Sequence, residues 1–166
     1  MQVCFIGHRH IDKTETLTRD LKEILVSLIK KGYTSFAFGS MSDFDDLAWE
    51  IITELKKEYA NIKRIYVRSR YQYLNNFHKE LLSKYYEETY FPKKLLNAGK
   101  YTYVERNFEM INNSTICIFY YNKDYAPPLK QQTTKNSLSP KRRKSGTKIA
   151  YEYAVKKNKQ IINLFQ

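Results

Sequence analysis

Several residue types that would point to particular functions are scarce in this sequence. Its 166 residues include only two cysteines, five glycines and four prolines, and no apolar run approaches the ~18 residues that a transmembrane helix needs. Two cysteines exclude a disulfide framework. Because Cys4 and Cys117 both fall inside expected buried strands, we interpret them as small core residues in a reducing compartment. The N-terminus shows no signal-peptide pattern, so we expect a cytoplasmic protein with no membrane partner.

The few glycines and histidines also do not form the common catalytic motifs. No Gly-rich dinucleotide or Walker pattern follows the first expected strand, and no Gly-x-Ser-x-Gly pattern surrounds a nucleophile. His8 and His10 share one turn, His78 is remote in sequence, and no cysteine or paired acid completes a metal-ligand cluster. The sequence therefore predicts no metal site and no bound cofactor.

Positive charge, in contrast, is abundant. The net charge of +12 is typical of nucleic-acid-binding proteins, but residues 123–144 alone contribute +6 and contain almost no apolar side chains. Burial cannot offset the ordering entropy of such a segment, so we expect a mobile loop there. Three roles stay open for it: a lid over a ligand, a weak nucleic-acid contact without sequence preference, or simple disorder.

Strand and helix patterns alternate along the rest of the chain. Hydrophobic content of 42% and charged content of 28% are those of a soluble globular protein, and we expect one domain over residues 1–166. We expect a Rossmann-like, doubly wound α/β fold with a five-stranded, mostly parallel sheet, helices on both faces, and the first strand in a central position. The expected strands cover residues 3–6, 36–38, 62–67, 115–121 and 160–165, and helical stripes cover residues 17–29, 44–55, 77–85, 104–111 and 149–154.

Local signals refine two of these segments. Asp12 is expected to cap the first helix, with Glu15 completing a capping box and Gly32 ending the helix at the C′ position. Residues 70–100 contain many tyrosines, and their spacing favours half-buried cover on a helix over stacking on nucleic-acid bases. These tyrosines are Tyr71, Tyr73, Tyr85, Tyr86 and Tyr90.

Polar residues gather where the expected strands end, which is where open α/β sheets bind ligands. The candidate ligand-binding residues are Gly7, His8, Arg9, Gly39, Ser40, Asp45, Arg106, Asn107, Ser145, Gly146 and Thr147. Helix N-termini and arginine suit phosphate, whereas the acidic turn around Asp45 repels it, so we expect Asp45 to accept a hydrogen bond from a ribose hydroxyl. Each motif alone also has a structural interpretation, since Ser, Thr and Asp are ordinary residues of helix N-termini.

The order of these motifs is more informative than any one of them. Phe5 to Arg9, Gly39 to Ala48, Glu105 to Asn107 and Ser145 to Thr147 together resemble the SLOG superfamily, the Rossmann-like group named for the Smf/DprA and LOG proteins. The chain is most similar to the small, stand-alone YpsA-like branch. This resemblance covers the chain apart from residues 70–100 and 123–144, and it implies a cleft that binds a nucleotide or a nucleotide-derived ligand.

The LOG enzymes of this superfamily cleave the N-glycosidic bond of nucleoside monophosphates, and the resemblance implies Arg106 in the place of their catalytic arginine. Their catalytic glutamate lies three residues after the threonine of the loop, where this chain has Ala150 after Thr147. Glu152 follows roughly 200° further round the helix. Ligand binding is therefore the leading function. A nucleotide-processing enzyme using Arg106 with Asp45 or Glu152, and a DprA-like nucleic-acid-binding protein, are the alternatives. The ligand's identity, the pathway and a homo-oligomeric state stay open.

Overall fold

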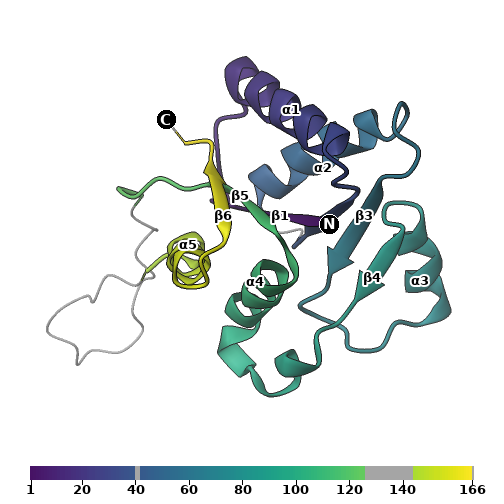
Figure 1. Ribbon diagram of the computed structural model, residues 1–166. Helices are drawn as coiled ribbons and strands as arrows, with labels where there is room; N and C mark the ends of the chain where they lie inside the picture. The colour runs from purple at the N-terminus through teal and green to yellow at the C-terminus, as the bar shows by residue number, and fades with distance from the viewer. Residues whose placement is uncertain (40–41, 126–143, 166) are drawn as a thin grey trace, which may run out of the picture.

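The computed structural model describes residues 1–39, 42–125 and 144–165, and within them six strands form one sheet (Figure 1). The strand order is β4-β3-β2-β1-β5-β6, and every neighbouring pair is parallel. The strands are β1 (Gln2–Gly7), β2 (Ser35–Phe38), β3 (Lys63–Val67), β4 (Glu88–Tyr90), β5 (Ile116–Tyr120) and β6 (Gln160–Asn163). The predicted Rossmann-like α/β fold and the interior position of β1 are confirmed.

Helices cover both faces of this sheet (Figure 1). They are α1 (Glu15–Lys30), α2 (Asp43–Leu55), α3 (Asn76–Ser83), α4 (Thr102–Asn113) and α5 (Gly146–Lys156), with short 3₁₀ turns η1 (Lys93–Asn97) and η2 (Gly99–Tyr101). One hydrophobic cluster lies between the sheet and α1 and α2, and a second lies between the sheet and α4 and α5. In the part of the chain described, none of these helices is both long and apolar enough to cross a membrane.

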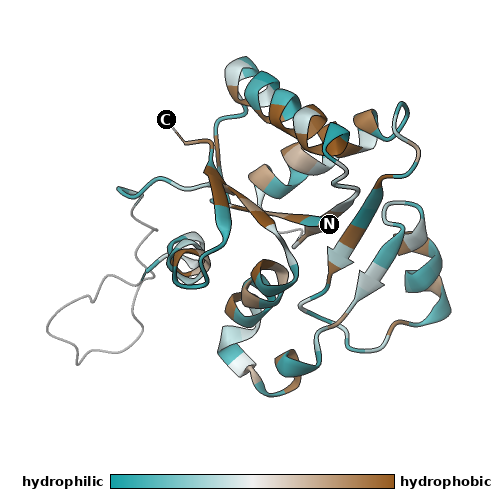
Figure 2. Ribbon diagram, in the orientation of Figure 1, coloured by the Kyte–Doolittle hydropathy of each residue, from teal (hydrophilic) through white to brown (hydrophobic). Residues whose placement is uncertain are grey.

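Burial on both faces explains why the central strands are nearly continuous hydrophobic runs. Val3, Cys4 and Phe5 in β1 are at most 1% exposed. Figure 2 shows the hydrophobic colour along these strands and on the helix sides that face them. Cys4 lies opposite Cys117 of β5, and both are free thiols in the core, as the sequence predicts.

The prediction of five strands was wrong, because the sheet extends by one strand beyond β3. Strand β4 contains three residues, Glu88, Thr89 and Tyr90, and none of them is fully buried. Its register pairs Ile65 with Glu88 and Val67 with Tyr90. So short a strand at the sheet edge needs no apolar run, and therefore leaves little signal in the sequence.

The predicted N-cap of the first helix was also wrong. Thr14, not Asp12, caps α1, since the Thr14 hydroxyl oxygen accepts the amide N–H of Leu17 at 3.1 Å. At the other end Gly32 adopts φ +87°, and its N–H bonds to the carbonyl of Ile29 at 2.9 Å. The predicted glycine terminus is confirmed.

The tyrosines of residues 70–100 divide into two groups. Tyr86 and Tyr90 are half-buried, as predicted, and Tyr86 stacks on Tyr66 of β3. For Tyr71, Tyr73 and Tyr85 the prediction of half-buried cover was wrong, because their exposed fractions are 70%, 83% and 46%. None of the five tyrosines lies in α3, so the helix on which the prediction relied is not realised for any of them.

Candidate functional site

Strand β1 ends at Gly7, which two helices approach closely. A Cβ atom on Gly7 would lie 2.4 Å from the Cβ of Phe44 in α2, so only glycine permits this packing. The hydroxyl of Thr147, in the first turn of α5, donates to the Gly7 carbonyl at 2.9 Å. Gly7 and Thr147, both predicted site residues, therefore meet at the carboxyl end of β1, and the hydroxyl proton of Thr147 is used within the protein.

His8 and Arg9 leave β1 in different environments. His8 is 3% exposed, its Nε2 accepts the backbone N–H of Asn122 at 2.9 Å, and its ring stacks on Tyr125 with centroids 4.1 Å apart. Burial lowers the pKa of His8, which favours the neutral ring that this acceptor role requires. Arg9 is exposed, and its carbonyl accepts the N–H of Asp43 at 2.8 Å. Of the two side chains, Arg9 is the one accessible to a ligand.

Asp45 lies buried in the first turn of α2, beside the end of β2. Its carboxylate accepts the backbone N–H of Gly39 at 3.3 Å and the hydroxyl of Ser42 at 2.9 Å. Burial raises the pKa of Asp45, whereas the charge of Arg106 and the two hydrogen bonds act in the opposite direction. The predicted residue Ser40 lies outside the described residues.

Arg106 reaches from α4 to this same strand end. One Nη1 proton is donated to the Gly39 carbonyl, while Nε and Nη2 donate to Oδ1 of Asn107 at 3.3 and 2.9 Å. A Cβ atom on Gly39 would lie 2.6 Å from Cζ of Arg106, so the guanidinium needs glycine here. The structure thus brings together Gly39, Asp45, Arg106 and Asn107, which the sequence predicts as parts of one site.

The start of α5 contributes less than the sequence predicts. The Ser145 hydroxyl caps the helix by accepting the N–H of Lys148 at 3.1 Å, and Gly146 is exposed with open space at its Cβ position. Glu152 also lies on α5, where its carboxylate pairs with Nζ of Lys144 at 2.7 Å. This exposed ion pair gives Glu152 a partner away from Asp45 and Arg106.

Four further residues lie next to this group and were not predicted from the sequence. They are Tyr66, Arg68, Arg70 and Tyr103. Tyr66 of β3 lies within the electrostatic influence of Arg106, Arg68 and Tyr103, although burial is the main cause that raises the pKa of Tyr66. Arg68 is 9% exposed and Arg70 is exposed. Both arginines lie within three residues of the end of β3, as Arg9 lies within two residues of the end of β1. That shared position was the signal that could have found them.

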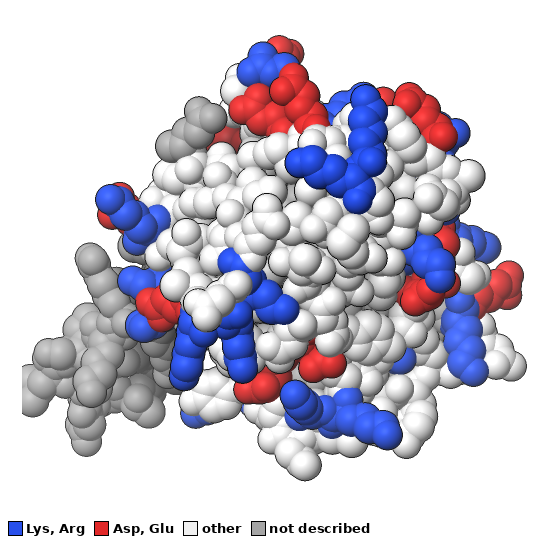
Figure 3. All heavy atoms as spheres, in the orientation of Figure 1, with Lys and Arg blue, Asp and Glu red and all other residues white. Residues whose placement is uncertain are grey.

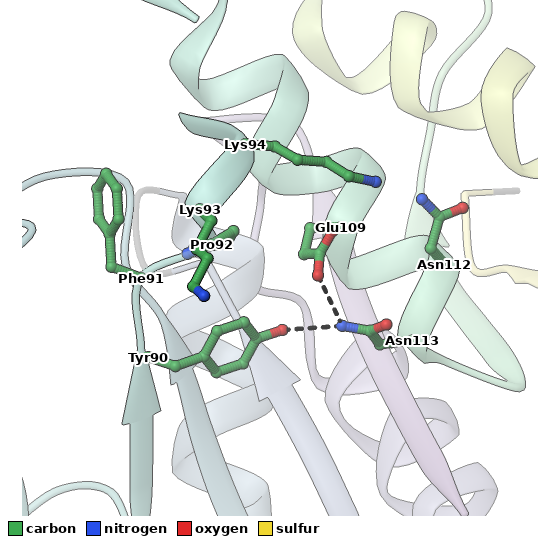
Figure 4. Close-up of a pocket in the computed structure, with 8 residues that line it drawn as sticks. All are labelled: Tyr90, Phe91, Pro92, Lys93, Lys94, Glu109, Asn112 and Asn113. Atoms are coloured by element: carbon green, nitrogen blue, oxygen red, sulfur yellow. Dashed lines mark hydrogen bonds between the residues drawn. The ribbon is translucent and has the colours of Figure 1, made fainter. Parts of the chain in front are cut away.

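A separate cavity of about 440 Å³ lies between the end of β4, the start of η1 and the last turns of α4 (Figure 4). The amide of Asn113 donates to the hydroxyl of Tyr90 and to the carboxylate of Glu109, both at 3.2 Å, and so closes one wall. Lys93 and Lys94 also line the cavity. It shares no lining residue with the group around Arg106.

The described surface carries its charges in several separate groups. In Figure 3, Lys and Arg side chains gather in several separate groups, and some of these groups have acidic side chains next to them. Of the basic segment 123–144, only residues 123–125 and 144 are described, so its predicted mobility lies outside the described residues. Within the ranges given above, no three His, Cys, Asp or Glu side chains are arranged to hold a metal ion.

Neither a protein-family model nor a curated protein matches this chain. The resemblance to the SLOG superfamily therefore rests on the motifs themselves and stays a prediction.

Proposed function

We propose that the chain binds a nucleotide, or a ligand derived from one, at the carboxyl edge of its sheet. The observation that carries this proposal is the environment of Arg106, whose side chain is buried and, among the described residues, hydrogen-bonded only to a carbonyl and an amide oxygen. A buried guanidinium without a contacting carboxylate is unfavourable by itself. Two of its five N–H groups have no acceptor among the described residues, and phosphate oxygens match the geometry of these donors.

Asp45 supports the sugar part of such a ligand. Its carboxylate accepts two hydrogen bonds from the protein and keeps further lone pairs for another donor. A ribose hydroxyl can donate a hydrogen bond to this carboxylate without placing a second negative charge next to it. Arg9, exposed at the neighbouring strand end, adds a cation that is open to solvent. A ligand with both a phosphate and a sugar hydroxyl satisfies this combination.

The test replaces Arg106 and measures binding of AMP, GMP, CMP and UMP by titration calorimetry. Arg106→Ala is expected to lose about 1.5–3 kcal/mol of affinity for the nucleotide that the wild type binds, the range for a hydrogen bond to a charged group. Arg106→Lys keeps the charge but not the fork-shaped donor set, and should also bind more weakly. Arg19→Lys on α1 is the matched control and should bind as the wild type does.

Thermal unfolding of each variant separates lost binding from lost folding. If the Arg106→Ala chain is unfolded, the comparison rests on Arg106→Lys. Unchanged affinity in a folded Arg106 variant contradicts the proposed site. Failure of all four nucleotides to bind the wild type contradicts the proposed function.

Cleavage of the N-glycosidic bond is the second candidate function, favoured by the buried carboxylate of Asp45 beside the proposed sugar position. A carboxylate there would stabilise the positive charge that develops on the sugar ring in the transition state. Glu152 suits this role less, because its carboxylate pairs with Lys144 on the exposed side of α5. Incubation with the four nucleotides, followed by chromatography for free base, tests it. Release that disappears in Asp45→Asn supports catalysis, and no release from any nucleotide contradicts it.

A further inference from the structure

The arginines of this chain differ in whether they have a carboxylate partner. Arg19 and Arg64 form ion pairs with Asp20 and Glu87, at 3.2 and 2.8 Å. The other arginines within residues 1–39, 42–125 and 144–165 form no ion pair with a described residue. They are Arg9, Arg68, Arg70 and Arg106. All four lie at the carboxyl edge of the sheet, whereas the two paired arginines lie on α1 and near the amino end of β3.

The four unpaired arginines form a row across three neighbouring strand ends, which we call the arginine row. Arg9 follows β1, Arg106 bonds to Gly39 at the end of β2, and Arg68 and Arg70 follow β3. Adjacent strands lie about 4.8 Å apart, so these positions extend roughly 10 Å along the sheet edge. That length exceeds what one phosphate group can contact.

The ring of Tyr103 lies near two arginines of this row, Arg106 and Arg70. Cζ of Arg106 lies 5.6 Å from the centre of the Tyr103 ring, and Cζ of Arg70 lies 5.8 Å from the same centre. Two cations on one ring repel each other unless an anion lies near them. The hydroxyl of Tyr103 and Nε of Arg68 are both buried without a hydrogen-bond partner among the described residues, which is rare for polar atoms. The missing acceptors are of the kind that phosphate oxygens supply.

The chain around Arg70 is held in place from inside the protein. Nη1 of Arg68 donates to the backbone carbonyls of Tyr71 and Gln72. Tyr71 has φ +55°, a conformation that is unfavourable for a residue with a bulky side chain. Backbone strain of this kind persists only where surrounding contacts impose it, and it concentrates at ligand sites. Arg68 therefore fixes the turn that presents the exposed Arg70.

We infer that the ligand carries at least two phosphate groups, the second of them bound at Arg70 beside Tyr103. This inference rests on the proposed function, in which Arg106 receives the first phosphate. A nucleoside monophosphate would leave Arg68 and Arg70 without counter-charge, whereas a diphosphate extends along the row. A nucleoside diphosphate and a dinucleotide share this chemistry and differ in whether the second phosphate is terminal or bridging.

The experiment compares AMP, ADP and the dinucleotide diadenosine diphosphate on the wild type, Arg70→Gln and Arg19→Gln by calorimetry. Both Arg70 and Arg19 are largely exposed, so neither substitution disturbs the core. We expect the wild type to bind ADP about tenfold more tightly than AMP, which corresponds to about 1.4 kcal/mol. Arg70→Gln should remove this preference while the Kd for AMP changes less than about twofold, and Arg19→Gln should keep it. Tight binding of the dinucleotide assigns a bridging position, and its exclusion assigns a terminal one.

Two results would overturn the inference while the proposed function survives: equal affinity of the wild type for AMP and ADP, or equal weakening of both in Arg70→Gln. If neither these ligands nor GMP, CMP and UMP bind, the proposed function fails, and inorganic pyrophosphate then tests the arginine row alone. Pyrophosphate binding that is lost in Arg70→Gln and kept in Arg19→Gln supports the second subsite. Absent or unchanged pyrophosphate binding contradicts it.

Discussion

The centre of the sheet and its β3–β4 edge are built by different interactions. Helix α1 buries five side chains against the central strands, whereas α3, beside the edge, has no buried residue. Phe77 of α3 is 68% exposed. The edge is connected instead by polar contacts, such as those from the backbone N–H and guanidinium of Arg64 to the carboxylate of Glu87. Hydrophobic burial therefore stabilises the centre, and hydrogen bonds and ion pairs have a larger share at the edge.

The candidate site lies where these two regions meet. Gly39 and Asp45 come from the central strand and helix, while Arg68 and Arg70 belong to the edge. A rigid centre positions Arg106 through the Gly39 carbonyl, and the more open edge presents Arg70 to solvent. The contrast predicts that substitutions in the centre change stability and that those at the arginine row change binding.

Truncating one leucine in each region should give the largest difference. Leu25 of α1 is fully buried, and Leu25→Ala is expected to lower the free energy of unfolding by about 2–5 kcal/mol. Leu81 of α3 is 40% exposed, and Leu81→Ala should stay within about 0.5 kcal/mol of the wild type. Urea unfolding followed by circular dichroism measures both. Similar losses in the two variants would show that α3 is packed more tightly than its exposure indicates.

Glycine substitutions distinguish steric packing from backbone conformation. Gly7→Ala places a Cβ against Phe44 and should destabilise the chain by about 1–3 kcal/mol through overpacking. Gly99 at the edge has open space but φ +52°, so Gly99→Ala should lose about 1 kcal/mol through strain alone. Asn tolerates this conformation, so Gly99→Asn should recover part of the loss, while Gly7→Asn should recover none. Urea unfolding of the four variants checks this, and recovery at position 7 would contradict the packing argument.

The same contrast explains how much of the fold could be predicted from the sequence. Strands β1 and β5 are buried on both faces, so their hydrophobic runs alone identify them. Strand β4 is three residues long and half-buried, and no pattern of that length separates it from a loop. The exposed Tyr71 and Tyr73 were misjudged because spacing alone does not show whether a segment is helical.

The site could be predicted in part for a related reason. The topology rule that ligands bind at strand carboxyl ends brought Gly39, Asp45 and Arg106 together across 67 positions of sequence. Arg68 and Arg70 obey the same rule, but no motif marks them. Tyr103 could not be assigned, because its proximity to two guanidinium groups depends on side-chain packing between α4 and the turn after β3.

The ion pairs of the edge should contribute less than the core. Although burial raises the pKa of Glu87, the hydrogen bonds and charges of Arg64 and the charge of Lys56 outweigh it and lower the pKa overall. Its carboxylate is 28% exposed, so solvent screening limits the loss in Glu87→Gln to about 1 kcal/mol. Glu88→Gln, next in sequence and paired with Lys63 on the surface, is the control and should change nothing measurable.

The Glu87 contribution also has a defined pH dependence. A lowered folded-state pKa means that the stabilisation is complete above the unfolded-state pKa of about 4.3 and is lost as the pH falls through the folded-state value. The difference in unfolding free energy between the wild type and Glu87→Gln should therefore be constant above about pH 5 and shrink as the pH falls below the unfolded-state pKa towards the folded-state value. A difference between them that persists in acid would assign the effect to packing and not to charge.

His8 should give the smallest effect, at the central strand end. Burial lowers its pKa in the folded state, so the unfolded chain takes up a proton first as the pH falls below about 6.5. The free energy of unfolding should then decrease from that pH down to the folded-state pKa of His8 and change no further from this group. In His8→Gln the amide oxygen can still accept the Asn122 N–H, but nothing titrates, so the decrease in this window should shrink. Urea unfolding at pH 7.5, 6.5 and 5.5 measures the two slopes, and an identical slope in His8→Gln would contradict a buried, neutral His8.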